Sequence, residues 1–324
     1  MKVKFGIIGC GHIAKRFAKN LAISKGGELY SAAARDVERA QALIDEFGGN
    51  VAYGNYLDLI CDENVEIVYI SLIHNLHFEV AKLCVEHGKA VICEKPFFLT
   101  KSEAVELAEL AYTKNILIME AMWTRCLPAF LKAKEWIKNG KIGEVKLIDA
   151  AFCFQFPLTE QTKAHRLYNP KTAGGALLDV GVYPYEFITG ILEEKPVEIQ
   201  AVVQKASTGV DETICMSMLF NSGAIGNAKA SIAVNTSDIA YIYGTKAHIK
   251  IDRFYAATSC ELIGNDGELL QKSTEPCDDG FIYEIEHICE LYRAGKTESP
   301  LIPISDSIDF AEAADIIRSK CNLG

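Results

Sequence analysis

The segment VICEKP contains a strand-like apolar run that ends abruptly in charge. Val91–Cys93 is followed directly by Glu94, Lys95 and Pro96. Burying a charged side chain without a partner is costly, so these charges must lie where solvent surrounds them or a reaction uses them. Pro96 ends the strand because it lacks a backbone donor. The simpler interpretation is that Glu94 and Lys95 are a solvated loop pair, and the alternative is a role in a reaction. The elements around them decide between these interpretations.

A second segment, AGGALLDVGVYPYEF, carries an acid and a phenol at helical spacing. Asp179 and Tyr183 are four residues apart, so in a helix over Val180–Gly190 both project from one face. Two other interpretations stay open. Asp179 has the residue type and position of a helix cap, and Tyr183 alone is typical of a half-buried core tyrosine.

A glycine turn stands near the start of the chain. The apolar strand Val3–Ile8 leads into GCGHIA, and residues 13–23 then follow helical spacing. In a strand, turn and helix of this kind, Gly9 permits the tight turn and Gly11 lets the backbone approach a pyrophosphate. The helix N-terminus offers N–H groups to the phosphates. The pattern predicts a dinucleotide site, and a plain βα turn is the alternative.

An alternation of strands and helices continues after this turn. Further strands are expected at 29–34, 67–72, 90–93 and 116–119, with helices at 37–47, 77–87 and 101–113 between them. Strands alternating with helices predict a doubly wound, mostly parallel sheet of the Rossmann type. Ligands bind beyond the carboxyl ends of such strands, which is where Glu94 and Lys95 lie.

The residues after the second strand indicate which dinucleotide binds. NAD-binding units place an acidic residue about twenty positions beyond the glycines, where it binds the ribose hydroxyls. Here Ala34 is near that place, and Arg35 and Arg39 follow. A guanidinium suits a 2′-phosphate, so NADP(H) is favoured. NAD(H) stays possible, with Asp36 holding the ribose and both arginines on the helix surface.

From residue 119 the pattern changes to consecutive strands with tight turns. A helix near 129–139 precedes strands expected at 144–156, 197–206, 213–220, 224–233, 239–243, 248–251 and 259–263, and helices at 279–294 and 305–320 close the chain. This predicts an α+β domain with a largely antiparallel open sheet. We therefore expect a Rossmann domain at 1–120 and a substrate-binding and oligomerisation domain at 121–324. VKLIDAAFCFQF and ICMSMLF lack clean alternation, which predicts a homodimer or larger assembly through the open sheet face.

Composition limits the class of partner. The 324 residues are 49% apolar and carry a formal charge of −10, which argues against nucleic acid or an anionic membrane as partner and favours a small molecule. The eleven cysteines are scattered, without a CxxC pair, as expected of a reduced cytoplasmic protein. No apolar run approaches the roughly 18 residues of a membrane helix, and no His or Cys spacing indicates a metal.

Three motifs together resemble one enzyme family. GIIGCGHIA, CEKP and GGALLDVGVYP, in this order and at these separations, resemble the glucose-fructose oxidoreductase, inositol dehydrogenase and rhizopine catabolism (Gfo/Idh/MocA) family, over essentially the whole chain. ISLIHNLH, EAMWTR and LLDVGVYP look most like its branch of dimeric dihydrodiol dehydrogenases, also described as NADP-dependent D-xylose dehydrogenases.

The resemblance assigns roles to the residues introduced above. It implies that Lys95 is the active-site lysine beside the nicotinamide and that Tyr183 occupies the position of the proton-transferring residue. It also implies that Asp179 binds substrate hydroxyls or steadies this pair. His77 matches a histidine near the cofactor or in a supporting shell. His74 replaces an asparagine common elsewhere in the family, which leaves the adjoining loop geometry open.

The chemistry agrees with these implied roles. Oxidation of an alcohol requires hydride transfer and removal of the hydroxyl proton. A phenol with a reference pKa of about 10 is a poor base at neutral pH, and a nearby ammonium lowers that pKa. Lys95 and Tyr183 therefore make a coherent acid–base pair. The residues expected to contact the cofactor are Gly9, Gly11, His12, Ile13, Arg35, Arg39, Leu72, His74, His77, Glu94, Lys95, Trp123 and Arg125.

The sequence thus predicts an NAD(P)-dependent oxidoreductase that transfers a hydride between the nicotinamide and a hydroxyl-bearing carbon of a sugar, polyol or trans-dihydrodiol. The alternatives are a non-catalytic NADP-binding regulator and a reductase of an unsaturated substrate on the same fold. A regulator has no need of Lys95, Asp179 and Tyr183, so the presence of all three favours the enzyme.

Overall fold

The structure, a computed structural model, describes residues 2–323. These residues form two compact units. The first unit runs up to Trp123 and also contains Asp279–Ile308. The second contains Thr124–Asp278 and the chain from Asp309 onward. The predicted division at residue 120 placed 279–308 in the second domain, whereas their contacts place them in the first unit.

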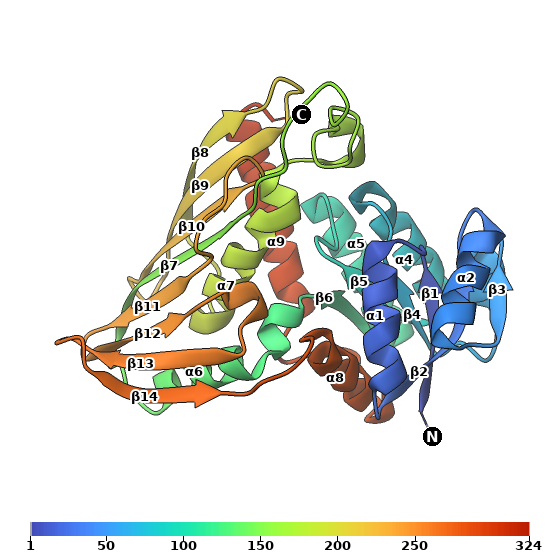
Figure 1. Ribbon diagram of the computed structural model, residues 1–324, viewed down its shortest axis with the longest axis horizontal. Coiled ribbons are helices and arrows are strands. Elements are labelled where there is room, and N and C mark those ends of the chain that lie inside the picture. Colours follow the sequence, from blue (N-terminus) through green and yellow to red (C-terminus); the bar gives the residue numbers. More distant parts are fainter. Residues whose placement is uncertain (1, 324) are drawn as a thin grey trace. The chain divides into compact units, whose positions relative to one another are not determined.

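The first unit contains a six-stranded sheet with the order β3-β2-β1-β4-β5-β6 (Figure 1). All five strand pairs are parallel. Its strands are β1 (Val3–Ile8), β2 (Gly27–Ala33), β3 (Val51–Tyr53), β4 (Ile67–Ile70), β5 (Ala90–Glu94) and β6 (Ile118–Ala121). The order reverses beside β1, between β2 and β4, and this switch point is where doubly wound sheets bind ligands. The predicted Rossmann sheet is confirmed.

Helices connect these strands and cover the sheet. They are α1 (His12–Ile23), α2 (Val37–Phe47), α3 (Tyr56–Cys61), α4 (His77–Glu86) and α5 (Lys101–Lys114), and α8 (Phe281–Arg293) joins them from late in the sequence. The central strands β4 and β5 are buried along their whole length. Parallel strands covered on both faces need such continuous apolar runs, which is why the sequence predicted them well.

The second unit is built on an eight-stranded sheet with the order β14-β13-β12-β11-β7-β10-β9-β8. Its strands are β7 (Val145–Cys153), β8 (Glu198–Lys205), β9 (Asp211–Leu219), β10 (Ile225–Ser231), β11 (Ala240–Gly244), β12 (Ala247–Ile251), β13 (Ser259–Gly264) and β14 (Leu269–Thr274). Only the pair of β7 and β10 is parallel among these described strands, so the predicted largely antiparallel sheet is confirmed.

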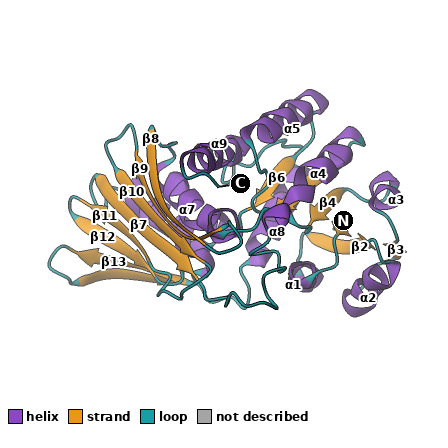
Figure 2. Ribbon diagram, turned by 90° about the horizontal axis from the view of Figure 1, so that it is seen from above, coloured by secondary structure: helices purple, strands orange, loops and turns teal. Residues whose placement is uncertain are grey.

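Helices cover one face of this sheet. They are α6 (Pro128–Lys138), α7 (Val182–Leu192) and the second-unit part of α9 (Ile304–Lys320); Figure 2 shows α7 lying along that face. Burial along β9 alternates, with Ile214 and Met216 buried and Cys215 exposed. This alternation leaves Cys215, Ser217 and Leu219 exposed on one face of β9 in the single chain, so the expected cover of both faces stays a prediction. Among residues 2–323, no helix has the length and apolar character needed to span a membrane.

Candidate active site

The glycine turn after β1 is shaped for close backbone approach. Gly9 has φ +92°, and a Cβ on it would lie 2.7 Å from the carbonyl oxygen of Ser71. The Ser71 hydroxyl donates a hydrogen bond to the Gly9 carbonyl at 2.7 Å. At Gly11 a Cβ would meet nothing within 4 Å, and no side chain caps α1, which begins at His12. The first amides of α1 thus have no side-chain cap as acceptor, and the backbone at Gly11 leaves room for a ligand, so the turn fits a pyrophosphate.

The contacts of the residues after β2 favour the arginines, rather than Asp36, as the side chains that bind the ribose end of the cofactor. Asp36 caps α2, because its side chain accepts a hydrogen bond from the Glu38 amide at 3.1 Å. Arg39 donates from Nη2 to the Cys10 carbonyl at 3.2 Å, so its side chain reaches the glycine turn. Arg35 is exposed. With the carboxylate engaged in capping, the two guanidinium groups are better placed to meet a 2′-phosphate.

His77 ties together the loops that follow β4 and β5. Its Nδ1 lies 2.8 Å from the Pro96 carbonyl oxygen, and its Nε2 lies 3.1 Å from that of Leu72. Burial lowers the pKa of His77, and the Lys95 charge acts in the same direction. The ring of His74 packs against that of His77 with centroids 5.9 Å apart. These contacts favour a supporting position near Lys95 for His77, and its role and that of His74 stay predictions.

Glu94 is buried rather than solvated. It accepts a hydrogen bond from the hydroxyl of Tyr69 at 2.6 Å. Burial raises the pKa of Glu94, while the Lys95 charge and the Tyr69 hydrogen bond act in the opposite direction. Lys95 itself is half-buried at the end of β5. The pair is therefore not an ordinary solvated loop, and Glu94 is better placed to support Lys95 than to contact a cofactor.

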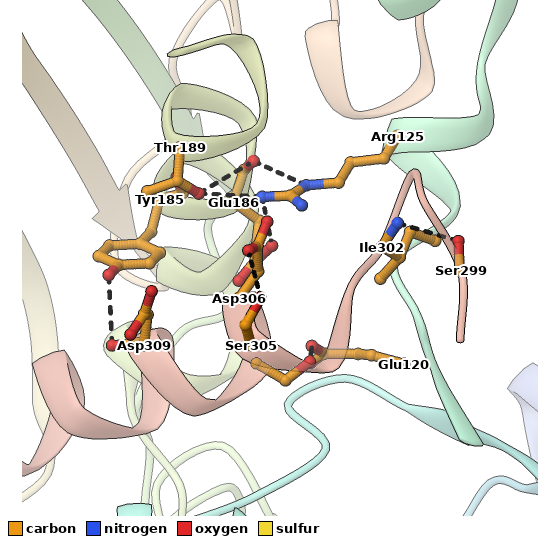
Figure 3. Close-up of polar contacts among 11 residues, drawn as sticks. Glu120, Arg125, Tyr185, Glu186, Thr189, Ser299, Ile302, Ser305, Asp306 and Asp309 are labelled. Atoms are coloured by element: carbon orange, nitrogen blue, oxygen red, sulfur yellow. Dashed lines mark hydrogen bonds and ion pairs between the residues drawn. The ribbon is translucent and has the colours of Figure 1, made fainter. Parts of the chain in front are cut away.

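The loop after Lys95 is anchored from β6. The Phe97 amide donates to Oε1 of Glu120 at 3.0 Å, and the Ser307 hydroxyl donates to Oε2 of Glu120 at 2.5 Å. Figure 3 labels Glu120. Both carboxylate oxygens are thus engaged, which fixes the chain just beyond Lys95 and Pro96.

The second unit presents Tyr183 and Asp179 from one continuous helical segment. A π-helical turn, η4 (Leu177–Gly181), carries Asp179 and runs directly into α7, which carries Tyr183. Asp179 lies inside the turn and pairs with Arg166 at 2.7 Å, so it is not the cap of the helix. Tyr183 is 8% exposed, and its ring meets Phe152 edge-on at a centroid distance of 5.2 Å.

Two predicted cofactor residues are held mainly by protein groups. Trp123, in the first unit, packs against Phe281 with ring centroids 5.2 Å apart. Arg125, in the second unit, is 1% exposed and pairs with the Glu186 carboxylate at 2.7 Å. Its Nη2 also donates to the Thr189 hydroxyl at 2.9 Å (Figure 3). This burial favours a structural role for Arg125 over the cofactor contact expected from the sequence.

The structure therefore gathers the predicted residues into two groups. Gly9, Gly11, Arg39, His77 and Lys95 belong to the first unit, at or beside the carboxyl ends of its strands. Asp179 and Tyr183 belong to the second unit, and their pairing with Lys95 stays a prediction. Within residues 2–323, no three His, Cys, Asp or Glu side chains gather as a metal site requires.

Sequence reasoning missed three side chains that shape these groups, namely Tyr69, Ser71 and Asp211. Each bonds a residue distant in the chain, for example Tyr69 to Glu94 and Asp211 to Leu177. The one available signal was Tyr69 itself, a tyrosine within an apolar strand. A buried phenol needs a polar partner, so its presence indicates a buried polar group nearby.

Family models match both units. The model described as "Oxidoreductase family, NAD-binding Rossmann fold" matches residues 3–122. The model described as "GFO/IDH/MocA C-terminal domain" matches residues 130–250.

Similar proteins cover the whole chain. The trans-1,2-dihydrobenzene-1,2-diol dehydrogenase of Mus musculus is 33% identical, with 100% of this chain and 98% of the relative covered. That of Homo sapiens is 31% identical, with the same coverage.

Two solved structures share the fold. An aldose-aldose oxidoreductase from Caulobacter crescentus in complex with glycerol matches with TM-score 0.88 at 20% identity, covering 99% of this chain and 98% of that chain. A 3-ketoreductase from Actinomadura kijaniata in complex with NADP and TDP-benzene matches with TM-score 0.86 at 24% identity, covering 98% of both chains.

Proposed function

The chain belongs to the Gfo/Idh/MocA family of oxidoreductases, and from this premise we propose that it is an NADP(H)-dependent dehydrogenase of a sugar, polyol or trans-dihydrodiol. The observation that carries the proposal is the half-buried Lys95 at the carboxyl end of β5 in a nucleotide-binding sheet. The names of the mammalian relatives favour a vicinal diol among these substrates.

The residues divide the chemistry between them. Bound at the glycine turn, a nicotinamide dinucleotide would supply the hydride acceptor or donor. Tyr183 takes the hydroxyl proton during oxidation and returns it during reduction. Lys95 stabilises the negative charge that develops on the substrate and tyrosine oxygens. Asp179, held by Arg166, orients the substrate hydroxyls.

A substrate panel tests this proposal. Aldoses, inositols and vicinal diols are each incubated with NADP and, separately, with NAD, while the absorbance of the reduced cofactor is followed. We expect reduced cofactor with at least one class, and faster with NADP. Tight NADPH binding without turnover of any member would favour the regulator instead. NADPH oxidation by an unsaturated compound, without turnover of any member of the panel, would favour the alternative reductase.

Cofactor choice gives a separate prediction for Arg35. If its guanidinium binds the 2′-phosphate, Arg35→Ala should weaken NADPH binding by about 1.5–3 kcal/mol, the scale of a charged hydrogen bond, and leave NADH binding nearly unchanged. Fluorescence titration with both cofactors measures the difference. Lys19→Ala, which removes one exposed positive charge from α1, is the matched control. Equal weakening of both cofactors by Arg35→Ala would give Arg35 a structural role.

The open face of the second unit's sheet gives a prediction about assembly. It carries exposed apolar side chains on β8, β9, β10 and β11, namely Val202, Leu219, Ile225 and Tyr243. Such a surface is typical of an interface, so we propose a homodimer formed through this face. Light scattering at micromolar concentration should give about twice the mass of one chain. Leu219→Lys should shift the mass toward one chain, and a wild-type monomer would contradict the proposal.

We also propose a cytoplasmic location. All eleven cysteines are free, which suits a reducing compartment.

A further inference from the structure

The segment that carries Asp179 and Tyr183 begins at a buried carboxylate from another part of the chain. Asp211, the first residue of β9, is 4% exposed. Its Oδ2 accepts a hydrogen bond from the Leu177 amide at 2.5 Å, and the Ala176 amide also donates to this carboxylate. Amides at the start of a helix have no acceptor within the helix. Asp211 supplies that acceptor from outside.

The local sequence is arranged around this contact. Gly175 has φ +120°, and a Cβ there would overlap Oδ1 of Asp211. A Cβ on Gly174 would lie 2.5 Å from the Arg166 carbonyl oxygen and 2.6 Å from that of Leu167. The two glycines therefore let the chain pass between this carboxylate on one side and the backbone of Arg166 and Leu167 on the other.

We propose that Asp211 is a positioning residue, whose carboxylate fixes the beginning of the η4–α7 segment and thereby places Asp179 and Tyr183 for catalysis. The Asp179 amide donates to the Gly175 carbonyl at 3.2 Å, so the clamped turn leads directly into the residue that pairs with Arg166. Tyr183 follows one turn later on α7. The claim that Asp211 places catalytic residues rests on the proposed function. The claim that its carboxylate holds the start of the segment rests on the contacts given above.

The charged side chains around Asp211 are paired with other groups, so the backbone amides of Ala176 and Leu177 are the groups that bind its carboxylate. Lys205 is its partner in register on β8, but the ammonium of Lys205 donates to the Asn322 carbonyl at 2.7 Å. Asp179 on η4 is paired with Arg166. From α9, Arg318 contributes its charge at longer range, and its Nη2 lies 2.7 Å from Asp315.

Burial of this carboxylate has a cost that can be measured. Burial raises the pKa of Asp211 from 3.8 to about 7, against the amide hydrogen bonds and the Arg318 charge. Because the folded-state pKa lies above the unfolded value, the associated stability is present below 3.8 and lost as the pH rises through about 7. The melting temperature of the wild type should therefore fall relative to that of Asp211→Asn between about pH 5 and pH 8.

Hydrogen exchange and kinetics on Asp211→Asn test the proposal. Asparagine replaces the charged carboxylate by a neutral amide with one acceptor oxygen instead of two, which weakens the hold on these amides. Exchange in the peptide 174–183 at about pH 8 should therefore quicken by about tenfold or more. Turnover should fall by about tenfold or more, with KM for NADP within about twofold, because the cofactor residues lie in the first unit. Asp266→Asn, an exposed carboxylate that accepts the Glu268 amide in its own turn, should change none of these values.

Each outcome decides the proposal. Unchanged hydrogen exchange in 174–183 would show that Asp211 does not hold the start of this segment. Faster exchange with unchanged turnover would show that Asp211 does not position the catalytic residues. If Asp211→Asn does not fold, Asp211→Ser, which keeps one acceptor without the charge, is measured with the same expected direction. A wild-type chain without nicotinamide-linked turnover would contradict the proposed function, while the exchange experiment would still decide the clamp.

Discussion

Lys95→Met is expected to lower turnover by about 10²–10⁴, the range for a lost acid–base contribution. Methionine keeps most of the side-chain volume and removes the ammonium, so folding and NADPH binding should largely persist. Steady-state kinetics on the substrate that the panel identifies, with a fluorescence titration of NADPH, measure both quantities. A solvated loop lysine would give nearly wild-type values.

Lys101→Met is the matched control, because Lys101 is an exposed lysine at the beginning of α5. It should keep wild-type turnover. A Lys95→Met enzyme that retains more than about a third of its activity would place Lys95 among ordinary loop residues and remove its catalytic role.

Tyr183→Phe should cause a loss similar to that of Lys95→Met, because only the hydroxyl is removed and the ring still packs against Phe152. If the two residues act as one unit, the double variant should be scarcely slower than either single variant. The three turnover numbers, measured on one substrate, complete a double-mutant cycle.

Tyr185→Phe is the control for this cycle. Tyr185 is buried two residues further along, and its hydroxyl donates to the Asp309 carbonyl at 3.2 Å (Figure 3). Its loss should lower thermal stability and leave turnover nearly unchanged. Independent losses that multiply in the Lys95 and Tyr183 double variant would show that the two residues do not share one proton-transfer function.

The sequence predicted the elements whose own pattern is strong. The parallel strands β4 and β5 are continuous apolar runs, and the antiparallel strands are separated by glycine turns, so both sheets could be expected from local patterns. The short elements β3 and α3, with 3 and 6 residues, were missed because so few positions cannot show the hydrophobic periodicity of a strand or a helix. The grouping of residues 279–308 with the first unit was not expected either, because it depends on contacts of α8 with α1 rather than on local sequence.

The candidate site divides in the same way. Gly9 and Lys95 follow strands directly, so the rule that ligands bind at the carboxyl ends of strands located them. Glu94 was expected beside the cofactor because it follows a strand directly, and Arg125 was expected there as part of the EAMWTR motif. Their burial depends on partners distant in sequence, Tyr69 and Glu186, which no local pattern identifies. Asp211 escaped notice for the same reason.

The most direct test of hydride transfer is a single-turnover reaction with a substrate that carries deuterium on its hydroxyl-bearing carbon, mixed with NADP. Mass spectrometry of the cofactor then shows where the label goes. We predict that the NADPH formed carries the deuterium and that the hydroxyl-bearing carbon has become a carbonyl. NADPH formed without the label, or oxidation of the substrate without NADPH, would contradict direct transfer between this carbon and the nicotinamide.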